Sequence, residues 1–189
     1  MKIIDLIGLI AGIIQAAGYV YYGYYVFKNT INPNTGSWLI WSYGNAIVCI
    51  NYILLGGNLS FSDSLPVVCS ILCVISGILF IFFKKIKKPK TYEVLILFVD
   101  ITITIYWYVT KENITTFILL QISVFISFVP IIREVLTDPS SERKKPWIIW
   151  SIAYGILFLS QITELDLKAI YPLNYMLLHT VIAVIAKKH

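Results

Sequence analysis

The segment SWLIWS (Ser37–Ser42) returns later in the chain as PWIIWS (Pro146–Ser151). The first tryptophans of the two segments, Trp38 and Trp147, are 109 positions apart, and the second tryptophans keep the same offset. Two apolar segments that carry the same pair of tryptophans indicate an internal repeat, which membrane proteins often contain. The flanking sequence holds the rest of the repeated unit.

Carried backward, the same offset aligns Gly18–Thr30 with Ser127–Pro139 without a gap. Further along the chain, Pro66 matches Pro172 at an offset of 106. These matches keep their order, so three consecutive elements of the first half correspond to three of the second half. The sequence therefore predicts two copies of a three-helix unit.

Seven apolar segments fill most of the 189 residues, and each is long enough, or nearly so, to cross about 30 Å of hydrocarbon as a helix. The chain is 58% hydrophobic and only 13% charged, which is too apolar for a soluble domain of this length. We expect one all-α integral membrane domain over residues 1–189. Its predicted transmembrane helices are Ile4–Phe27, Trp38–Leu55, Leu65–Phe83, Tyr92–Val109, Ile114–Leu136, Trp147–Ile162 and Ile170–Ala186.

The fourth helix, at residues 92–109, has no counterpart in the repeat. A unit of three helices enters the membrane on one side and leaves on the other, so a second copy would be inverted without one additional crossing. The linker helix restores the orientation and gives a 3+1+3 plan of parallel repeats, related by an axis along the membrane normal. Repeat 1 then covers residues 4–83 and repeat 2 covers residues 114–186.

Seven crossings divide the basic residues unevenly between the two faces. Twelve of the fifteen lie on one face, and only Lys2, Lys111 and Lys168 lie on the other. Because basic residues concentrate in short cytoplasmic loops, we expect a cell (inner) membrane protein with its N-terminus outside and its C-terminus in the cytoplasm. The net charge of +5 then reflects contact with the lipid bilayer and not with nucleic acid. The basic face comprises Lys28, Lys84, Lys85, Lys87, Lys88, Lys90, Arg133, Arg143, Lys144, Lys145, Lys187 and Lys188.

The 3+1+3 plan, with a proline-bearing helix, a short loop and a tryptophan-rich helix, resembles the PQ-loop and SWEET-type membrane proteins. The nearer resemblance is to a bacterial group of seven-helix membrane proteins of this type, through NPNTGSWLIW (Asn32–Trp41) and FVPIIREVLTDPSSERKKPWIIW (Phe128–Trp150). Neither half has the Pro-Gln pair, because the second half has Pro130-Ile131 and the first has Tyr21-Tyr22 at that place. The resemblance implies a transporter-like fold and no particular substrate.

Two tryptophans and three other polar side chains are the candidates for binding a small polar solute. Trp41 and Trp150 lie one turn inside the cytoplasmic end, where an indole can face the axis and stack on a ring. Asn45 and its repeat partner Tyr154 lie deeper in the same helices, and the resemblance adds Asn174. The alternative for Asn45 and Asn174 is hydrogen bonding between helices. We expect the outer tryptophans, Trp38 and Trp147, in an aromatic belt at the headgroups.

Four further residues are candidates for gating or proton coupling. Pro130 frees a backbone carbonyl and allows a kink, and Tyr21 stands at the matching place of the first half, so both are candidates for gating. Asp100 is the one carboxyl deep in the hydrocarbon, and His179 follows Asn174 on the last helix. Each is a candidate for proton coupling; the alternatives are a carboxyl that ties the linker helix to its neighbours and a histidine satisfied by packing.

No sequence pattern points to an enzyme, a cofactor or a metal. There is no HExxH, Walker or GxSxG motif, and Cys49, Cys69 and Cys73 do not have metal-site spacing. Two functions remain open. The first is a small-solute transporter or facilitator with alternating access between two three-helix bundles, and a polar and aromatic axial cavity would favour it. The second is a non-transporting sensor or accessory subunit, which a dry, tightly packed axis would favour. A homo-oligomer is compatible with either.

Overall fold

The computed structural model describes residues 2–56, 59–83, 88–162 and 166–187, and these residues contain no β-strand. The prediction of an all-helical chain is confirmed, and, apart from a break inside the fifth predicted helix, the helix ends fall within three residues of the predicted ones. The elements are α1 (Ile3–Phe27), α2 (Thr35–Gly56), η1 (Phe61–Asp63), α3 (Ser64–Phe82), α4 (Thr91–Thr110), α5 (Asn113–Ser127), α6 (Val129–Thr137), η2 (Pro139–Ser141), α7 (Lys144–Ile162), η3 (Leu167–Ala169) and α8 (Ile170–Ile185).

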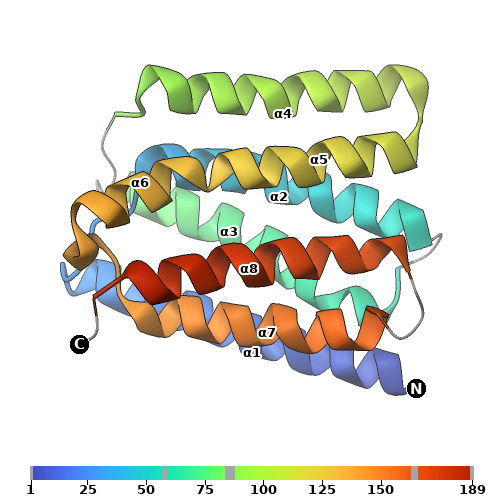
Figure 1. Ribbon diagram of the computed structural model, residues 1–189, viewed down its shortest axis with the longest axis horizontal. Helices are drawn as coiled ribbons and strands as arrows, with labels where there is room; N and C mark the ends of the chain where they lie inside the picture. The colour runs from blue at the N-terminus through green and yellow to red at the C-terminus, as the bar shows by residue number, and fades with distance from the viewer. Residues whose placement is uncertain (1, 57–58, 84–87, 163–165, 188–189) are drawn as a thin grey trace.

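Six helical segments in the described residues are long and apolar enough to cross a membrane. They are α1, α2, η1 with α3, α4, α5 with α6, and η3 with α8. Many large apolar side chains on these helices are exposed on the outside of the bundle, which fits a multi-pass membrane protein. Helix α7 is not among the six, but it lies alongside the others and runs in the same direction as the bundle axis (Figure 1).

The fifth predicted segment forms two helices instead of one, and Pro130 accounts for the break. Proline has no backbone N–H and its ring clashes with the carbonyl four residues earlier, at Ile126. Helix α5 therefore ends at Ser127, and α6 restarts at Val129 with the proline in its first turn. The residue between the two helices, Phe128, is buried and points into the bundle.

We call α1, α2 and α3 the first group and α5 to α8 the second, and α4 lies outside both (Figure 1). In the first group α3 contacts both α1 and α2, and in the second α8 contacts both α7 and the α5–α6 segment. The two groups meet where α1 packs on α7 and where α2 packs on α5. Helix α4 lies on α2 and α5 at the outside of the bundle.

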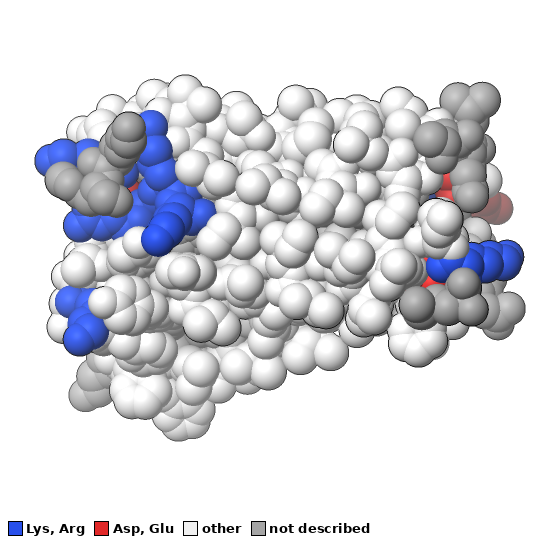
Figure 2. Space-filling view, turned by 90° about the horizontal axis from the view of Figure 1, so that it is seen from below, with Lys and Arg blue, Asp and Glu red and all other residues white. Residues whose placement is uncertain are grey.

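The chain termini lie at opposite ends of the bundle (Figure 1). Figure 2 shows lysines and arginines gathered mainly at the end that holds the C-terminus, with an uncharged band along the middle. We call this end the basic end and the other the opposite end. Lys84, Lys85, Lys87 and Lys188 of the predicted basic face lie outside the described residues, and its described members are Lys28, Lys88, Lys90, Arg133, Arg143, Lys144, Lys145 and Lys187.

Candidate functional site

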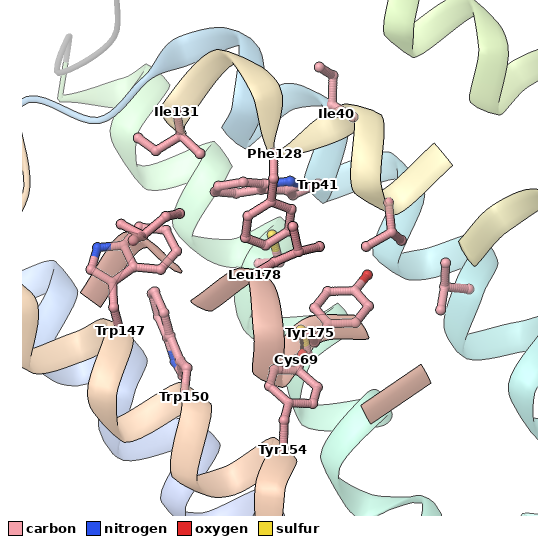
Figure 3. Packing of buried hydrophobic residues seen from close by; sticks show 14 of the residues in the cluster. Ile40, Trp41, Cys69, Phe128, Ile131, Trp147, Trp150, Tyr154, Tyr175 and Leu178 are labelled. Carbon is pink, nitrogen blue, oxygen red and sulfur yellow. Dashed lines mark hydrogen bonds between the residues drawn. The ribbon is translucent and has the colours of Figure 1, made fainter. Parts of the chain in front are cut away.

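A small cavity lies on the axis of the bundle, between the two groups of three helices. Its volume is about 20 Å³, which is room for roughly one water molecule. Every wall residue is uncharged or a histidine, and most carry aromatic rings. Figure 3 shows several of these rings, among them Trp41, Trp150 and Tyr154, converging from different helices. The wall consists of Tyr19, Trp38, Trp41, Asn45, Cys69, Cys73, Phe128, Trp147, Trp150, Tyr154, Tyr175 and His179.

Trp41 and Trp150, both predicted for the site, form part of this wall from opposite groups. The indole N–H of Trp41 donates to Ser127 Oγ on α5 at 3.1 Å. The indole N–H of Trp150 donates to the backbone carbonyl of Gln15 on α1 at 3.2 Å. The Trp150 ring lies against Gly18, where an added Cβ would overlap the indole. Each tryptophan therefore reaches across the axis to the first helix of the other group.

Asn45 and Tyr154, also predicted, lie deeper in the same wall. The Asn45 carbonyl oxygen accepts a hydrogen bond from the Tyr175 hydroxyl at 2.7 Å, and its amide nitrogen lies 3.6 Å from Cys73 Sγ. The Tyr154 hydroxyl lies 3.2 Å from Cys69 Sγ, and its ring stacks on Tyr175 with centroids 4.9 Å apart. These contacts satisfy the polar groups from inside the protein and still present them to the cavity.

Asn174, the fifth predicted binding residue, lies away from this cavity. Its amide nitrogen donates to the Gln121 side-chain oxygen at 3.1 Å, between α8 and α5. One residue further on α8, Tyr175 points to the axis instead. A shift of one residue turns a helix by about 100°, so the two neighbours face different surroundings. Asn174 joins helices within one group.

Asp100 lies beside a second, smaller cavity of about 10 Å³. Its carboxyl accepts a hydrogen bond from Ser123 on α5, which ties α4 to the bundle. The two cavities share Trp41, Asn45 and Tyr175 as wall residues. Asp100 thus holds the linker helix in place and borders the axis from outside the two groups.

His179 packs among the rings of the first cavity. Its ring centroid lies 5.2 Å from that of Tyr154 and 5.4 Å from that of Trp147. The ring nitrogen Nδ1 lies 2.6 Å from the Tyr175 carbonyl oxygen. A carbonyl oxygen only accepts, so Nδ1 carries a proton in this arrangement. His179 and Asp100 are on different cavities, linked through Asn45 and Tyr175.

At the basic end, Tyr22 takes the place expected for Tyr21. Tyr21 is 41% exposed and lies under the Lys145 ammonium group, 5.0 Å from its ring, whereas Tyr22 is 1% exposed. The Tyr22 hydroxyl accepts from the Trp38 indole at 3.2 Å and donates to Glu142 Oε1 at 2.8 Å. The structure does not bring Tyr21 to the axis.

Glu142 completes this network from the connection between α6 and α7. Its Oε2 accepts from the Trp147 indole at 3.0 Å, so the carboxyl joins α1 to α7, and the bond of Trp38 to Tyr22 adds α2 to the network. The side chain is 0% exposed, and burial raises its pKa to about 8, against the opposing effect of its hydrogen-bond donors. The predicted headgroup belt of Trp38 and Trp147 is wrong, because both indoles are buried in this network.

Glu134 adds a second contact between the groups at this end. Its carboxylate on α6 accepts from the Asn34 side-chain nitrogen, just before α2. The Asn34 side-chain oxygen accepts from the Ser37 backbone N–H at 2.8 Å, which caps the start of α2. We call the contacts of Tyr22, Asn34, Glu134 and Glu142 the basic-end closure.

At the opposite end, a buried ion pair joins the two groups. Lys168 Nζ in η3 lies 3.0 Å from Asp63 Oδ1 in η1, and both side chains are largely buried. The same ammonium lies 4.1 Å from the Tyr52 ring centroid, and Tyr52 also bonds to Gln161. We call these four residues the opposite-end closure.

Tyr22, Tyr175 and Glu142 are the functional candidates that the sequence analysis missed. A spacing signal existed for one of them, because Tyr171, Tyr175 and His179 are four residues apart and share one helix face. Nothing in the local sequence indicates that Glu142 is buried, because a glutamate beside Arg143 and Lys144 is typical of a solvated loop.

The described residues contain no group of three or more histidine, cysteine, aspartate or glutamate side chains able to hold a metal ion. In comparisons with known proteins, no family model, no curated protein and no solved structure matches the chain.

Proposed function

We propose that the chain is a small-solute membrane transporter or facilitator of the PQ-loop and SWEET-like type, working by alternating access between two three-helix bundles. The observation that carries the proposal is the axial cavity, because both groups supply its wall and a cross-group closure lies at each end. In this arrangement, contacts between the groups lie on both sides of the cavity. Entry of a solute larger than water then requires the groups to separate at one end.

Four features support a repeat relationship between the groups. Helices α2 and α7 begin at Thr35 and Lys144, the same 109 positions apart as Trp38 and Trp147. The short 3-10 turns η1 and η3, which directly precede α3 and α8, are 106 positions apart, as are Pro66 and Pro172. The third helix of each group contacts the other two. The contact of α1 with α7 has its counterpart in the contact of α5 with α2.

A seventh crossing by α7 completes the proposed topology. Helix α7 packs along α1 and α8, two of the six apolar spans, and lies within the same bundle. Seven crossings agree with chain termini at opposite ends (Figure 1). Basic residues favour the cytoplasmic side, so the basic end faces the cytoplasm, with the N-terminus outside and the C-terminus inside.

A non-transporting role has one observation in its favour. The axial cavity of about 20 Å³ is small, whereas a groove of about 610 Å³ lies outside, between α1 and α7 at the opposite end. Ile3, Ile7, Ile156 and Leu159 are among its wall residues, so an apolar partner helix would fit there. A sensor or accessory subunit would use this groove and keep the axis closed.

Solute flux through reconstituted protein distinguishes the two roles. Proteoliposomes are exposed to osmotic gradients of glycerol, urea, hexoses, amino acids and nucleosides, and their swelling is followed by light scattering. Transport predicts faster swelling for at least one solute class and loss of that flux in Trp150→Ala. Swelling equal to that of protein-free vesicles for every solute contradicts transport and favours the second role.

Binding is measurable in parallel, because four of the five tryptophans line the cavity. The fifth, Trp107, bonds to Asn113 near the opposite end. In a Trp107→Phe background the tryptophan emission reports on the cavity alone. A transported solute is expected to change this emission in a saturable way.

A further inference from the structure

Within the part of the chain that the structure describes, no cation pairs with the buried carboxyl of Glu142. Among the described residues the one ion pair is that of Asp63 and Lys168, at the far end of the bundle. The neighbouring Arg143 guanidinium points elsewhere and donates to the Thr30 carbonyl at 3.4 Å. An unpaired buried carboxylate is costly, so such a group tends to hold a proton.

The groups that face Glu142 have opposite effects on its pKa. Tyr22 from α1, Trp147 from α7 and the backbone N–H of Arg143 donate hydrogen bonds that favour the charged form. Burial favours the neutral form, and so does the like charge of Glu134 from α6. Burial is the largest of these effects, and it brings the pKa to about 8, within reach of cytoplasmic pH.

The position of Glu142 links this proton to the basic-end closure. Its bond to Tyr22 crosses from the second group to the first, and the Trp38 indole binds the same hydroxyl. Separation of the groups at this end would break that bond and admit water to the carboxyl. A hydrated glutamate has a pKa of about 4.3, so the carboxyl holds its proton more tightly in the closed arrangement than in the open one.

We propose that Glu142 is a proton-binding site, protonated while the basic end is closed, which releases its proton to cytoplasmic water as that end opens. The link to opening rests on the proposed function, whereas the proton site itself stands without it. Loss of the proton leaves a buried charge, and opening relieves that charge by hydration. The transporter would thereby couple opening toward the cytoplasm to release of one proton.

Infrared spectroscopy of the reconstituted protein tests the proton site directly, because a protonated carboxyl has a carbonyl stretch that vanishes on ionisation. The spectrum is recorded from about pH 6 to about pH 9. We expect a carboxyl band that disappears with a midpoint near about 8, is absent from Glu142→Gln and persists in Asp100→Asn. A band that persists in Glu142→Gln, or a spectrum without such a transition in the wild type, overturns the assignment.

Tyr22→Phe supplies a second measurement that does not depend on the folding of Glu142→Gln. Removal of the hydroxyl takes away a donor that favours the carboxylate, so the midpoint of the infrared transition should move to higher pH. An unchanged midpoint in Tyr22→Phe contradicts the proposed contact between the two groups.

The link to opening is tested on Cys69 in a Cys49→Ala/Cys73→Ala background. A membrane-impermeant thiol reagent is applied to the basic end in inside-out vesicles. Labelling of Cys69 should increase with pH, and the increase should be larger in this background than in the same protein that also carries Glu142→Gln. Ionisation of the Cys69 thiol contributes equally in both proteins, so the difference between them reports on Glu142. An equal increase of labelling in the two proteins would contradict the link between Glu142 and opening. If the reconstituted protein moves no solute, the infrared measurement still decides whether Glu142 binds a proton.

Discussion

Trp41 and Trp150 occupy matching places on opposite sides of the axis, and each indole contacts position 18 or its equivalent in the other group. Trp41 donates to Ser127 Oγ, and Trp150 lies against Gly18. Gly18 and Ser127 are 109 positions apart, the same offset that relates the two tryptophans. The two tryptophan contacts thus fall at matching positions of the proposed repeat.

Gly18→Ala is expected to destabilise the protein, because the new methyl group would overlap the Trp150 indole. Overpacking of this kind costs about 1–3 kcal/mol. Gly23→Ala on the same helix is the matched control, since a Cβ there meets no atom within 4 Å. Thermal unfolding in detergent should show a lower midpoint for Gly18→Ala alone. Equal midpoints for the two variants would remove the argument for close packing at Gly18.

Asn45 and Asn174 should differ in their effect on solute flux. Asn45 lines both cavities, so Asn45→Leu would deprive a polar solute of a partner, at a cost of about 1–3 kcal/mol, or roughly fivefold or more in flux. Asn174→Leu removes only its bond to Gln121, worth about 0.6 kcal/mol in a membrane. The assay is proteoliposome flux of whichever solute the wild type moves. Equal losses in the two variants would place the binding site elsewhere.

The buried pair of Asp63 and Lys168 should show strong energetic coupling. Lys168→Met leaves Asp63 buried without its partner, and breaking a buried pair from one side costs about 3–5 kcal/mol. Asp63→Asn in the same protein should recover most of that loss. Unfolding by denaturant of the wild type, both single variants and the double variant gives the coupling. Lys111→Met, an exposed lysine at the same end, is the control; additive losses at the pair would contradict its role in the closure.

Stability should fall as the pH rises through the pKa of Glu142. The closed, folded protein holds this proton up to about pH 8, while an unfolded glutamate releases it near about 4.3. Between these two pH values the folded state therefore binds more protons than the unfolded state. The stability that this proton contributes is complete below about pH 4.3 and is lost above about pH 8. The thermal midpoint should be lower at about pH 9 than at about pH 6. Glu142→Gln should flatten this difference, and an undiminished pH dependence in that variant would assign it to another group.

The helices were predictable from sequence because each is bounded by charged or loop-forming residues and is long enough to span hydrocarbon. The break at Pro130 followed from the chemistry of proline. The direction of each side chain around its helix was harder to predict. These helices are apolar on nearly every face, so hydrophobic periodicity gives no inward face. Tyr22 is at the axis where Tyr21 was expected, and Tyr175 where Asn174 was expected, each a shift of one residue.

The burial of Glu142 could not be predicted from the sequence for a different reason. It stands in a connection beside Arg143, Lys144 and Lys145, and nothing local distinguishes it from a solvated residue. Only the packing of α1 against α7 removes it from water and brings Tyr22 to it. Trp38 and Trp147 were placed at the headgroups for the same reason, since their burial depends on contacts between the groups.

Labelling of Cys69 from each side of the membrane tests alternating access most directly, because this thiol lies in the wall of the axial cavity. The protein retains Cys69 alone, through Cys49→Ala and Cys73→Ala, and a membrane-impermeant thiol reagent is applied to right-side-out and to inside-out vesicles. A protein that opens at each end in turn predicts labelling from both sides, with none after Cys69→Ala. A thiol that stays unlabelled from both sides while the protein remains folded would contradict a cavity that opens, and with it the proposed transport.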